Sequence, residues 1–511
     1  MSESAPPSPA RTSAGVTFSE RQIKQVIIGV MAGMAVAALD GTIVNTALPT
    51  IVVDLGGLKY YAWVGTAYML TSTASTPLFG KISDLYGRRR PFQAAIALFV
   101  LGSLFCGIAQ NMPQLVLARG LQGIGGGGIF ALSFAIVGDV VAPRDRGRYI
   151  GMLTSVFTVA SVVGPLLGGF IVDHSSWRWI FLINLPIGAI ALSITDRSLR
   201  FPFQVRPHSI DWQGATLLVC GVTSLLLGLS WTGEEYGWGH ASTLGLFALS
   251  VVLTAAFVWW EKRADEPIVP MTLLNIDVVR VIMPFMFLVG AAFFGTNAFL
   301  PLYLQGVTGV SATNSGLLLA PVAIATAIAA TSAGRYTART GSYRHIAPYG
   351  TVIGVIGLCM LALLKSSSGY LALAIAGSFL VGFAIGLVMP VATTATQNSV
   401  DITQMGAASS VLVFVRQLGG AVGLAAFGAA FNASLSDRID PGLVQAPRMI
   451  KKLPEPQRTE ALTALTNALT VVFKISIPVL VIALFCAVRI PIRPLRSTNN
   501  PAPADAAGAM H

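Results

Sequence analysis

Long apolar runs dominate the chain, and short polar segments separate them. Each run has roughly 20 residues, enough for a helix to cross a bilayer core of about 30 Å at about 1.5 Å per residue. We predict fourteen membrane-spanning helices, at residues 26–48, 61–80, 92–110, 113–137, 149–172, 177–195, 211–231, 242–260, 280–304, 313–333, 346–364, 369–392, 406–431 and 468–489. The pattern therefore predicts an all-α membrane protein.

Composition and the chain ends agree with that class. The chain is 54% hydrophobic and 11% charged, whereas soluble domains average about 25% charged residues. Such a composition excludes an ordinary soluble enzyme. Residues 1–25 are rich in Ser, Pro and Ala and lack an apolar core followed by a cleavage site, so we expect a disordered cytoplasmic tail and no cleaved signal peptide. We expect a second cytoplasmic tail at residues 491–511.

The net charge of +11 is explained by where the basic residues lie. With fourteen spans, the amino terminus inside and basic residues at span edges counted with the adjoining loop, 22 of the 33 Lys and Arg residues fall on the inner side, 8 on the outer side and 3 within spans. This is the positive-inside bias. The charge thus indicates orientation and contact with anionic membrane lipids, not a nucleic-acid partner. We expect a multi-pass protein of the cell (inner) membrane with both termini in the cytoplasm.

A short motif occurs twice, at a constant offset of 254 residues. The two copies are Gly80-Lys81, Gly87 and Arg90, and then Gly334-Arg335, Gly341 and Arg344. Asp84 of the first copy corresponds to Ala338 of the second. The repeat predicts two six-helix bundles in parallel orientation. We place them at residues 26–196 and 279–490, separated by a linker and an extra two-helix hairpin at 197–265.

Two charges inside the predicted spans carry the candidate chemistry. Asp40 lies within "AALDGTIVNTALPTIV" of the first span, and Arg119 lies in the fourth. A charge at the centre of a membrane helix costs about 2.5–3.5 kcal/mol on insertion scales, so it normally faces a cavity or a partner. Burial favours protonated Asp40, whereas a nearby Arg119 favours the ionised form. We interpret these residues as a proton-coupling pair, with a purely structural ion pair as the alternative.

Five motifs in the first half of the chain resemble one known family. "GKISDLYGRRR" is similar to the loop signature of the major facilitator superfamily. Four further segments resemble the motifs of its fourteen-helix drug:proton antiporters, namely "LDGTIVNTALP", "LARGLQGIGGGG", "GMLTSVFTVASVVGPLLGGF" and "WRWIFLINLPIG". The chain departs from that family at Ala160, where the fifth-helix motif commonly has glycine.

The resemblance implies the major facilitator fold and alternating access. It assigns an inner gate to Asp84, Arg88, Gly80 and Gly87, in which Asp84 meets the N-terminal end of the thirteenth helix near residues 403–406. A helix N-terminus favours an anion. The fifth-helix motif, associated with export, comprises Gly151, Gly164, Pro165, Gly168 and Gly169. Helix packing is the alternative for these glycines, and simple anchoring is the alternative for the basic loop.

Polar side chains at matching depths are candidates for a substrate cavity between the bundles. They are Asn45, Tyr68, Gln122, Asn297, Tyr303, Gln305, Gln397 and Gln417. The expected function is proton-coupled export of amphipathic, cationic small molecules by a monomer. An exporter of an endogenous metabolite or lipid fits the same motifs. A non-transporting membrane receptor of this fold is the alternative from another class.

We expect no catalysis, cofactor or metal. The four cysteines are far apart and lie in different predicted spans, so they suggest neither a metal site nor a disulfide framework. The chain has no G-x-x-x-x-G-K-[ST] sequence for ATP binding. The driving force must then be an ion gradient, which supplies about 2.3 kcal/mol per charge per 100 mV.

Overall fold

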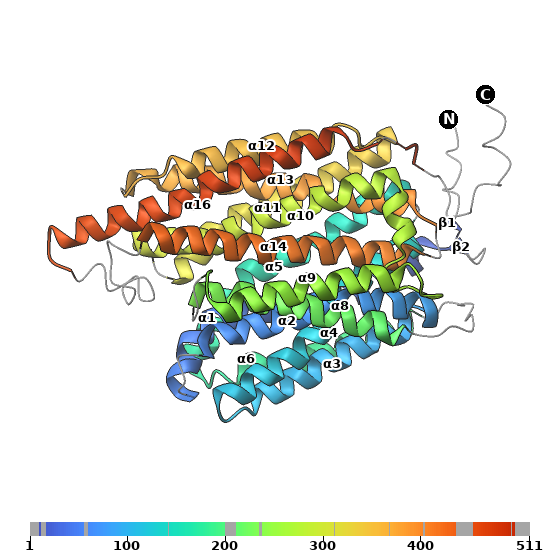
Figure 1. Ribbon diagram of the computed structural model, residues 1–511, viewed down its shortest axis with the longest axis horizontal. Coiled ribbons are helices and arrows are strands. Elements are labelled where there is room, and N and C mark those ends of the chain that lie inside the picture. Colours follow the sequence, from blue (N-terminus) through green and yellow to red (C-terminus); the bar gives the residue numbers. More distant parts are fainter. Residues whose placement is uncertain are drawn as a thin grey trace, which may run out of the picture.

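The computed structural model is a bundle of long helices that run side by side (Figure 1). It describes residues 10–11, 17–55, 60–141, 143–199, 211–234, 238–310, 312–366, 368–401, 404–435, 453–491 and 493–495. Most of the two predicted tails lies outside these residues. The first helix begins at Glu20, so residues 20–25 are helical, contrary to the predicted tail.

Helices account for nearly all of the described chain. They are α1 (Glu20–Leu55), α2 (Tyr61–Tyr86), α3 (Arg89–Gly107), α4 (Met112–Val140), α5 (Pro143–His174), α6 (Trp179–Leu182), α7 (Asn184–Ser198), α8 (Trp212–Glu234), α9 (Ala241–Glu261), η2 (Met271–Asn275), α10 (Asp277–Leu302), η3 (Tyr303–Val307), α11 (Ala312–Thr340), α12 (Ile346–Ala362), η4 (Ser368–Tyr370), α13 (Leu371–Ser399), α14 (Met405–Leu435) and α16 (Gln457–Val488). Two short strands, β1 (Ala10–Arg11) and β2 (Thr17–Phe18), pair antiparallel.

Each of the fourteen predicted spans coincides with a helix, α6 and α7 together forming one of them. Among the described residues, twelve helical segments are long and apolar enough to cross a membrane. The two helices outside that set are α12, which is apolar but has only 17 residues, and α2. A run of Ser and Thr in α2, "TSTAST" at residues 71–76, lowers its hydropathy, and most of this run is buried against other helices.

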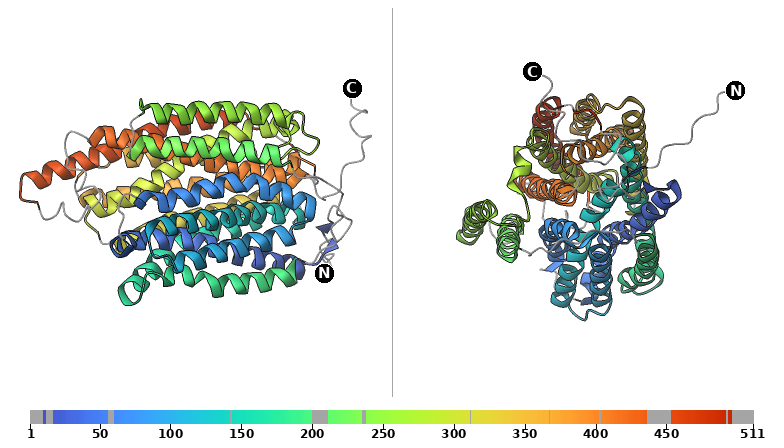
Figure 2. Two further views of the ribbon diagram at one scale, coloured as in Figure 1. Left: turned by 60° about the horizontal axis from the view of Figure 1, so that its bottom comes forward. Right: turned by 90° about the vertical axis from the view of Figure 1, so that its right-hand side faces the viewer.

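The two halves of the chain form separate cores (Figure 2). Two hydrophobic clusters draw almost entirely on α1–α7, and a third draws mainly on α8–α16. The repeated motif has a glycine with a positive φ angle at the same position in both halves, 81° at Gly87 and 68° at Gly341. Only glycine accepts this conformation readily. The sequence repeat is thus also a structural one.

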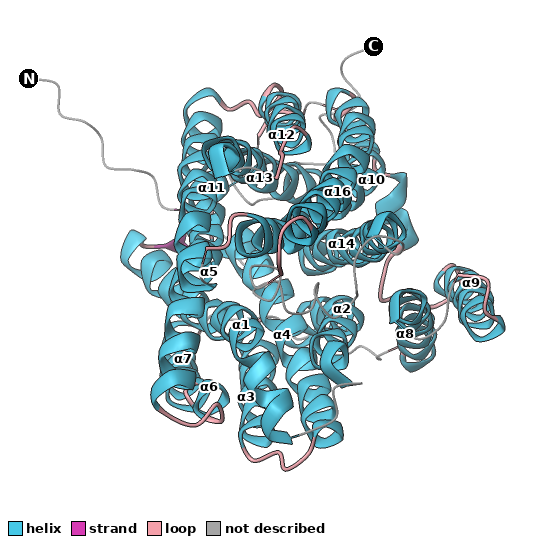
Figure 3. Cartoon of the chain, turned by 90° about the vertical axis from the view of Figure 1, so that its left-hand side faces the viewer, coloured by secondary structure: helices cyan, strands magenta, loops and turns pink. Residues whose placement is uncertain are grey.

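The extra hairpin lies at the side of the bundles (Figure 3). Helix α8 packs against α2 and α14, and α9 packs mainly against α8. Several large apolar residues of α9 are exposed, including Val251, Val252 and Trp259, at 69%, 62% and 56%. An apolar surface of this kind suits contact with lipid.

One end of the molecule is closed. This end, which we call the Asp84 end, contains the start of α1, the α2–α3 turn and the end of α16. Every residue of 125–138 in α4 and of 388–400 at the end of α13 is buried. Such burial all round a helix requires neighbours on every side. Farther from this end, residues 65–71 of α2 and residues 414–418 near the middle of α14 are at least partly exposed.

Candidate functional site

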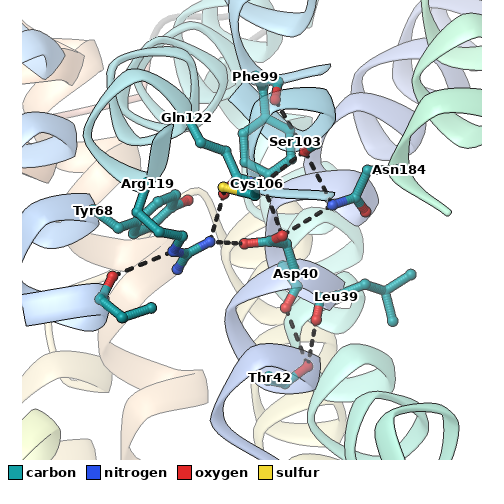
Figure 4. Close-up of polar contacts among 12 residues, drawn as sticks. Leu39, Asp40, Thr42, Tyr68, Phe99, Ser103, Cys106, Arg119, Gln122 and Asn184 are labelled. Atoms are coloured by element: carbon teal, nitrogen blue, oxygen red, sulfur yellow. Dashed lines mark hydrogen bonds and ion pairs between the residues drawn. The ribbon is translucent and has the colours of Figure 1, made fainter. Parts of the chain in front are cut away.

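A buried polar network surrounds Asp40 on α1 (Figure 4). Arg119 Nη1 on α4 lies 2.5 Å from Asp40 Oδ2, and the two side chains are only 3% and 0% exposed. Gln122 Nε2 and Asn184 Nδ2 each donate a hydrogen bond to Asp40 Oδ1, at 2.8 and 2.9 Å. The two residues that the sequence analysis paired are therefore in direct contact, and both carboxylate oxygens have donors.

The network continues to a third and a fourth helix. Ser103 Oγ on α3 accepts hydrogen bonds from Gln122 Nε2 at 2.7 Å and from Asn184 Nδ2 at 3.2 Å. Sequence reasoning missed both Ser103 and Asn184 as partners of the pair. Asn184 stands in the quoted motif "WRWIFLINLPIG", which could have indicated it. Nothing in the sequence distinguishes Ser103 from other serines in spans.

Arg119 is held from three further directions. Its Nη1 donates to Gln122 Oε1 at 2.6 Å, and its Nε donates to the carbonyl oxygen of Val64 at 3.3 Å. The guanidinium carbon lies 4.5 Å from the centre of the Tyr68 ring, within the range of a cation–π contact. The Tyr68 hydroxyl is buried and has no hydrogen-bond partner among the described residues. This hydroxyl is a donor available to a rearranged network.

A buried ion pair of this kind is poor evidence for stability. The desolvation of two charges can exceed their attraction, whereas removing one partner typically costs about 3–5 kcal/mol because the other charge is left uncompensated. Proton uptake by Asp40 would likewise remove the charge that balances Arg119. The arrangement can therefore couple protonation of one side chain to movement of the other.

A second ionic cluster joins the two halves at the Asp84 end. Asp84 on α2 accepts hydrogen bonds from the backbone N–H groups of Gly406 and Ala407, at 3.2 and 2.7 Å, in the first turn of α14. This is the contact that the resemblance implied for the thirteenth helix. Arg88 Nη1 lies 2.6 Å from Asp84 Oδ1, and Arg88 Nε lies 2.5 Å from Asp139 Oδ2 on α4. The sequence analysis did not find Asp139.

Glycines allow the halves to approach closely at this end. A Cβ on Gly80 would lie 2.1 Å from Ser410 Oγ on α14, and a Cβ on Gly406 would lie 2.2 Å from Asp84 Oδ1. In the second copy of the motif, a Cβ on Gly334 would lie 2.3 Å from the carbonyl carbon of Gly147 on α5. Both copies of the repeat thus place a glycine against a helix of the other half.

The fifth-helix motif serves two interfaces. A Cβ on Gly151 would lie 3.1 Å from the backbone of Ala330 on α11, and a Cβ on Gly164 would lie 2.0 Å from Thr42 Oγ1 on α1. Gly168 is buried, whereas a Cβ on Gly169 would meet nothing within 4 Å. Helix α5 continues through Pro165 without interruption. Packing therefore accounts for Gly151 and Gly164.

The candidate cavity residues whose side chains are described lie in different parts of the structure. Tyr68 and Gln122 belong to the Asp40 network. Tyr303 is fully buried and donates to the carbonyl oxygen of Lys365, and its place in a cavity stays a prediction. The remaining residues lie elsewhere: Gln397 is buried at the Asp84 end, Gln417 and Gln305 are partly exposed, and the side chains of Asn45 and Asn297 lie outside the described part of the chain.

The two halves are structural repeats that meet at helix crossings lined by glycine, and one half contains a buried ion pair. These features define the class of two-bundle membrane transporters. The chain belongs to the Major Facilitator Superfamily, whose family profile matches residues 30–424. The protein is thus a transporter and not an enzyme.

Comparisons with known proteins agree with this family. The chain is 38% identical to the multidrug transporter protein MdtP of Bacillus subtilis, over 83% of this chain and 78% of that protein. It is 35% identical to multidrug resistance protein 3 of the same organism, over 81% and 80%. A transporter of the acurin A biosynthesis cluster of Aspergillus aculeatus is also 35% identical, over 78% and 73%.

The fold is similar to that of solved transporters. The human organic anion transporter MFSD10 superimposes with a TM-score of 0.63, covering 89% of this chain and 99% of that one, at 17% sequence identity. At this identity the likeness concerns the fold alone.

Proposed function

We propose that the protein is a proton-coupled multidrug exporter that moves amphipathic compounds by alternating access. Its relatives at 35–38% identity include multidrug transporters. The observation that carries the proton coupling is the Asp40–Arg119 pair, a titratable carboxylate buried between apolar helices and held by three donors. Buried ionisable groups in membrane helices typically mark ion or proton pathways.

The proposed topology has fourteen spans in the cell (inner) membrane and both termini in the cytoplasm. The helices α2 and α12 are the two spans added to the twelve that meet the length and hydropathy criterion. The Asp84 end is assigned to the cytoplasm because it holds Lys81, Arg88 and Arg89. The functional bundles are residues 26–196 and 279–490, and the protein acts as a monomer surrounded by lipid.

In the proposed cycle, the structure represents a state closed to the cytoplasm. Asp84 holds the start of α14 and so keeps the inner gate, formed by Gly80, Gly87 and Arg88 around Asp84, shut. A proton reaches Asp40 from the opposite end, the charge that fixes Arg119 is lost, and the bundles rock. The proton then leaves toward the cytoplasm.

Substrate-dependent proton movement tests this proposal. Purified protein in liposomes, given a fluorescent amphipathic dye and an imposed pH gradient, should accumulate the dye against its gradient while protons leave the acidic compartment. A receptor that does not transport would bind the dye but leave the proton gradient intact, and that result would rule out the proposal.

An exporter of an endogenous metabolite is the second candidate. A relative at 35% identity is named for a biosynthesis cluster. Cells with and without the gene should differ in their susceptibility to added drugs if drugs are the cargo. If the drug profiles coincide and a cellular product accumulates inside the deletion strain, the cargo is a metabolite.

Labelling of native cysteines tests whether the hairpin is peripheral. Cys220 on α8 is exposed, and we expect a membrane-permeant maleimide to label it at the same rate with and without saturating substrate. A Gln417→Cys variant is the matched control, because Gln417 lies where α14 faces α2. Substrate should slow labelling of that cysteine several-fold. Strong protection of Cys220 would instead place the hairpin at the substrate cavity.

A further inference from the structure

Arg416 lies well inside α14, eleven residues after Met405, or about 16 Å along the helix. Its Nε is buried and makes no hydrogen bond, and none of its nitrogens lies within 4 Å of a carboxylate among the described residues. A charge at this depth in a membrane protein is costly and typically pairs with another group or serves transport. Arg416 has no such pairing within the described chain.

The charges of the two ionic clusters already have partners. Asp40 pairs with Arg119, and Arg88 pairs with both Asp84 and Asp139. Arg146 shows what a purely structural buried arginine looks like in this fold, because it donates to the carbonyl oxygens of Val141 and Gly138. Arg416 makes no comparable backbone bond in the part of the chain that is described. Within the described residues, its positive charge is therefore uncompensated.

The side chain faces the protein interior. Arg416, Gly420 and Gly423 follow one another at helical spacing and so share a face of α14. On that face a Cβ on Gly420 would lie 2.8 Å from the Phe294 ring, and a Cβ on Gly423 would lie 2.5 Å from Ala291, both on α10. The face therefore meets α10 and not lipid.

The surroundings of Arg416 suit an amphipathic ligand. Its guanidinium carbon lies 5.7 Å from the centre of the Phe294 ring, and Phe294 is 39% exposed although it lies within a span. Arg416 itself is partly exposed. The next residue, Gln417, approaches Thr76 of α2 at 3.5 Å, so the position adjoins the crossing between the two halves. A cation and an aromatic ring thus share accessible space beside the moving interface.

We propose that Arg416 binds the anionic group, a carboxylate or a sulfonate, of an amphipathic substrate, while Phe294 packs against its aromatic part. The inference rests on the proposed export function and names its substrate class. A guanidinium presents paired N–H donors that match the two oxygens of such a group. The cationic substrate expected from the sequence would need a free carboxylate, whereas Asp40 is occupied by Arg119 and two amides.

Exchange of a proton for an anionic substrate moves net charge across the membrane. One proton entering for one anion leaving transfers two elementary charges across the membrane, so the exchange is driven by the membrane potential. Exchange of one proton for one monovalent cation transfers none. Anion export by this protein is therefore electrogenic.

Equilibrium binding to purified protein, without any gradient, tests the substrate class. The probes are 2-naphthalenesulfonate and 2-naphthylmethylammonium, which share the ring system and differ in charge. We expect the wild-type protein to bind the sulfonate at least about tenfold more tightly, and Arg416→Gln to remove that preference. Arg416→Lys should restore part of it, and Lys262→Gln, at the exposed residue that follows α9, should leave it unchanged.

The outcomes are decisive in both directions. Equal affinity of the wild-type protein for the two probes, or full sulfonate binding by Arg416→Gln, would overturn the proposal. If Arg416→Gln does not fold, the comparison of the two probes on wild-type protein and on Arg416→Lys still decides it. Because no gradient is used, loss of proton coupling in liposomes would count against the export mechanism without changing this result.

Discussion

Proton-driven export by the Asp40→Asn variant is expected to fall to the level of protein-free liposomes. Asparagine has nearly the size of aspartate and can still accept hydrogen bonds from Gln122 and Asn184, but it carries no proton that titrates. It also leaves Arg119 buried without its counter-charge, which costs about 3–5 kcal/mol of stability. The measurement is dye accumulation in liposomes under an imposed pH gradient, with equilibrium dye binding measured in parallel. Asp40→Glu keeps the acid and should retain partial activity.

Two control variants separate coupling from stability. Asp54→Asn removes another carboxylate of α1, one that pairs with Arg178 on the surface, and should transport normally. The double variant Asp40→Asn/Arg119→Gln removes both charges, so it should fold better than Asp40→Asn and still fail to transport. Wild-type export by either variant that lacks the Asp40 carboxylate would reduce the pair to a structural role.

The Asp84→Asn variant is expected to open the Asp84 end while keeping substrate affinity. The substitution removes the anion that accepts from the backbone N–H groups of Gly406 and Ala407. Hydrogen bonds to a charged group contribute about 1.5–3 kcal/mol, so the ratio of closed to open molecules should fall by about 10- to 100-fold. Spin labels at positions 90 and 344, one on each half, should report a longer distance.

Asp139→Asn is the matched control for this gate. Asp139 also pairs with Arg88, but it lies on α4, whereas Asp84 also reaches α14. We expect Asp139→Asn to weaken the hold on Arg88 with a smaller change in the distance between the labels. An unchanged distance distribution in Asp84→Asn would mean that the contact with α14 does not hold the gate.

Much of the architecture could be predicted from the sequence because a bilayer leaves few choices. A backbone in hydrocarbon must satisfy its own hydrogen bonds, so each apolar run of about 20 residues becomes a helix. The fourteen predicted spans all coincide with helices, although α2 and α12 do not meet the criterion for a span. The two-fold repeat of the glycine motif likewise appears in the positive φ angles of Gly87 and Gly341.

Prediction from the sequence was weaker for the residues that hydrogen-bond to the buried charges. The hydropathy pattern gives the depth of a side chain in the membrane but not the neighbouring helix toward which it points. Depth alone made a contact between Asp40 and Arg119 possible, and it equally suggested Tyr303, whose hydroxyl group instead donates to the carbonyl oxygen of Lys365. Ser103, Asn184 and Asp139 were not found as partners. Their roles arise from helices that are distant in sequence and adjacent in space.

The sequence by itself determined the class of protein, the positions of the helices and the residues that are costly in a membrane. Those properties depend on hydropathy and spacing along one chain, and the lipid solvent acts on each span locally. Only the tertiary structure decided which costly charges are paired. Among the described residues, Asp40 and Asp84 acquire ionic partners and Arg416 does not. Pairing depends on which helix faces meet when the two halves pack, a property of the assembled bundle and not of any single span.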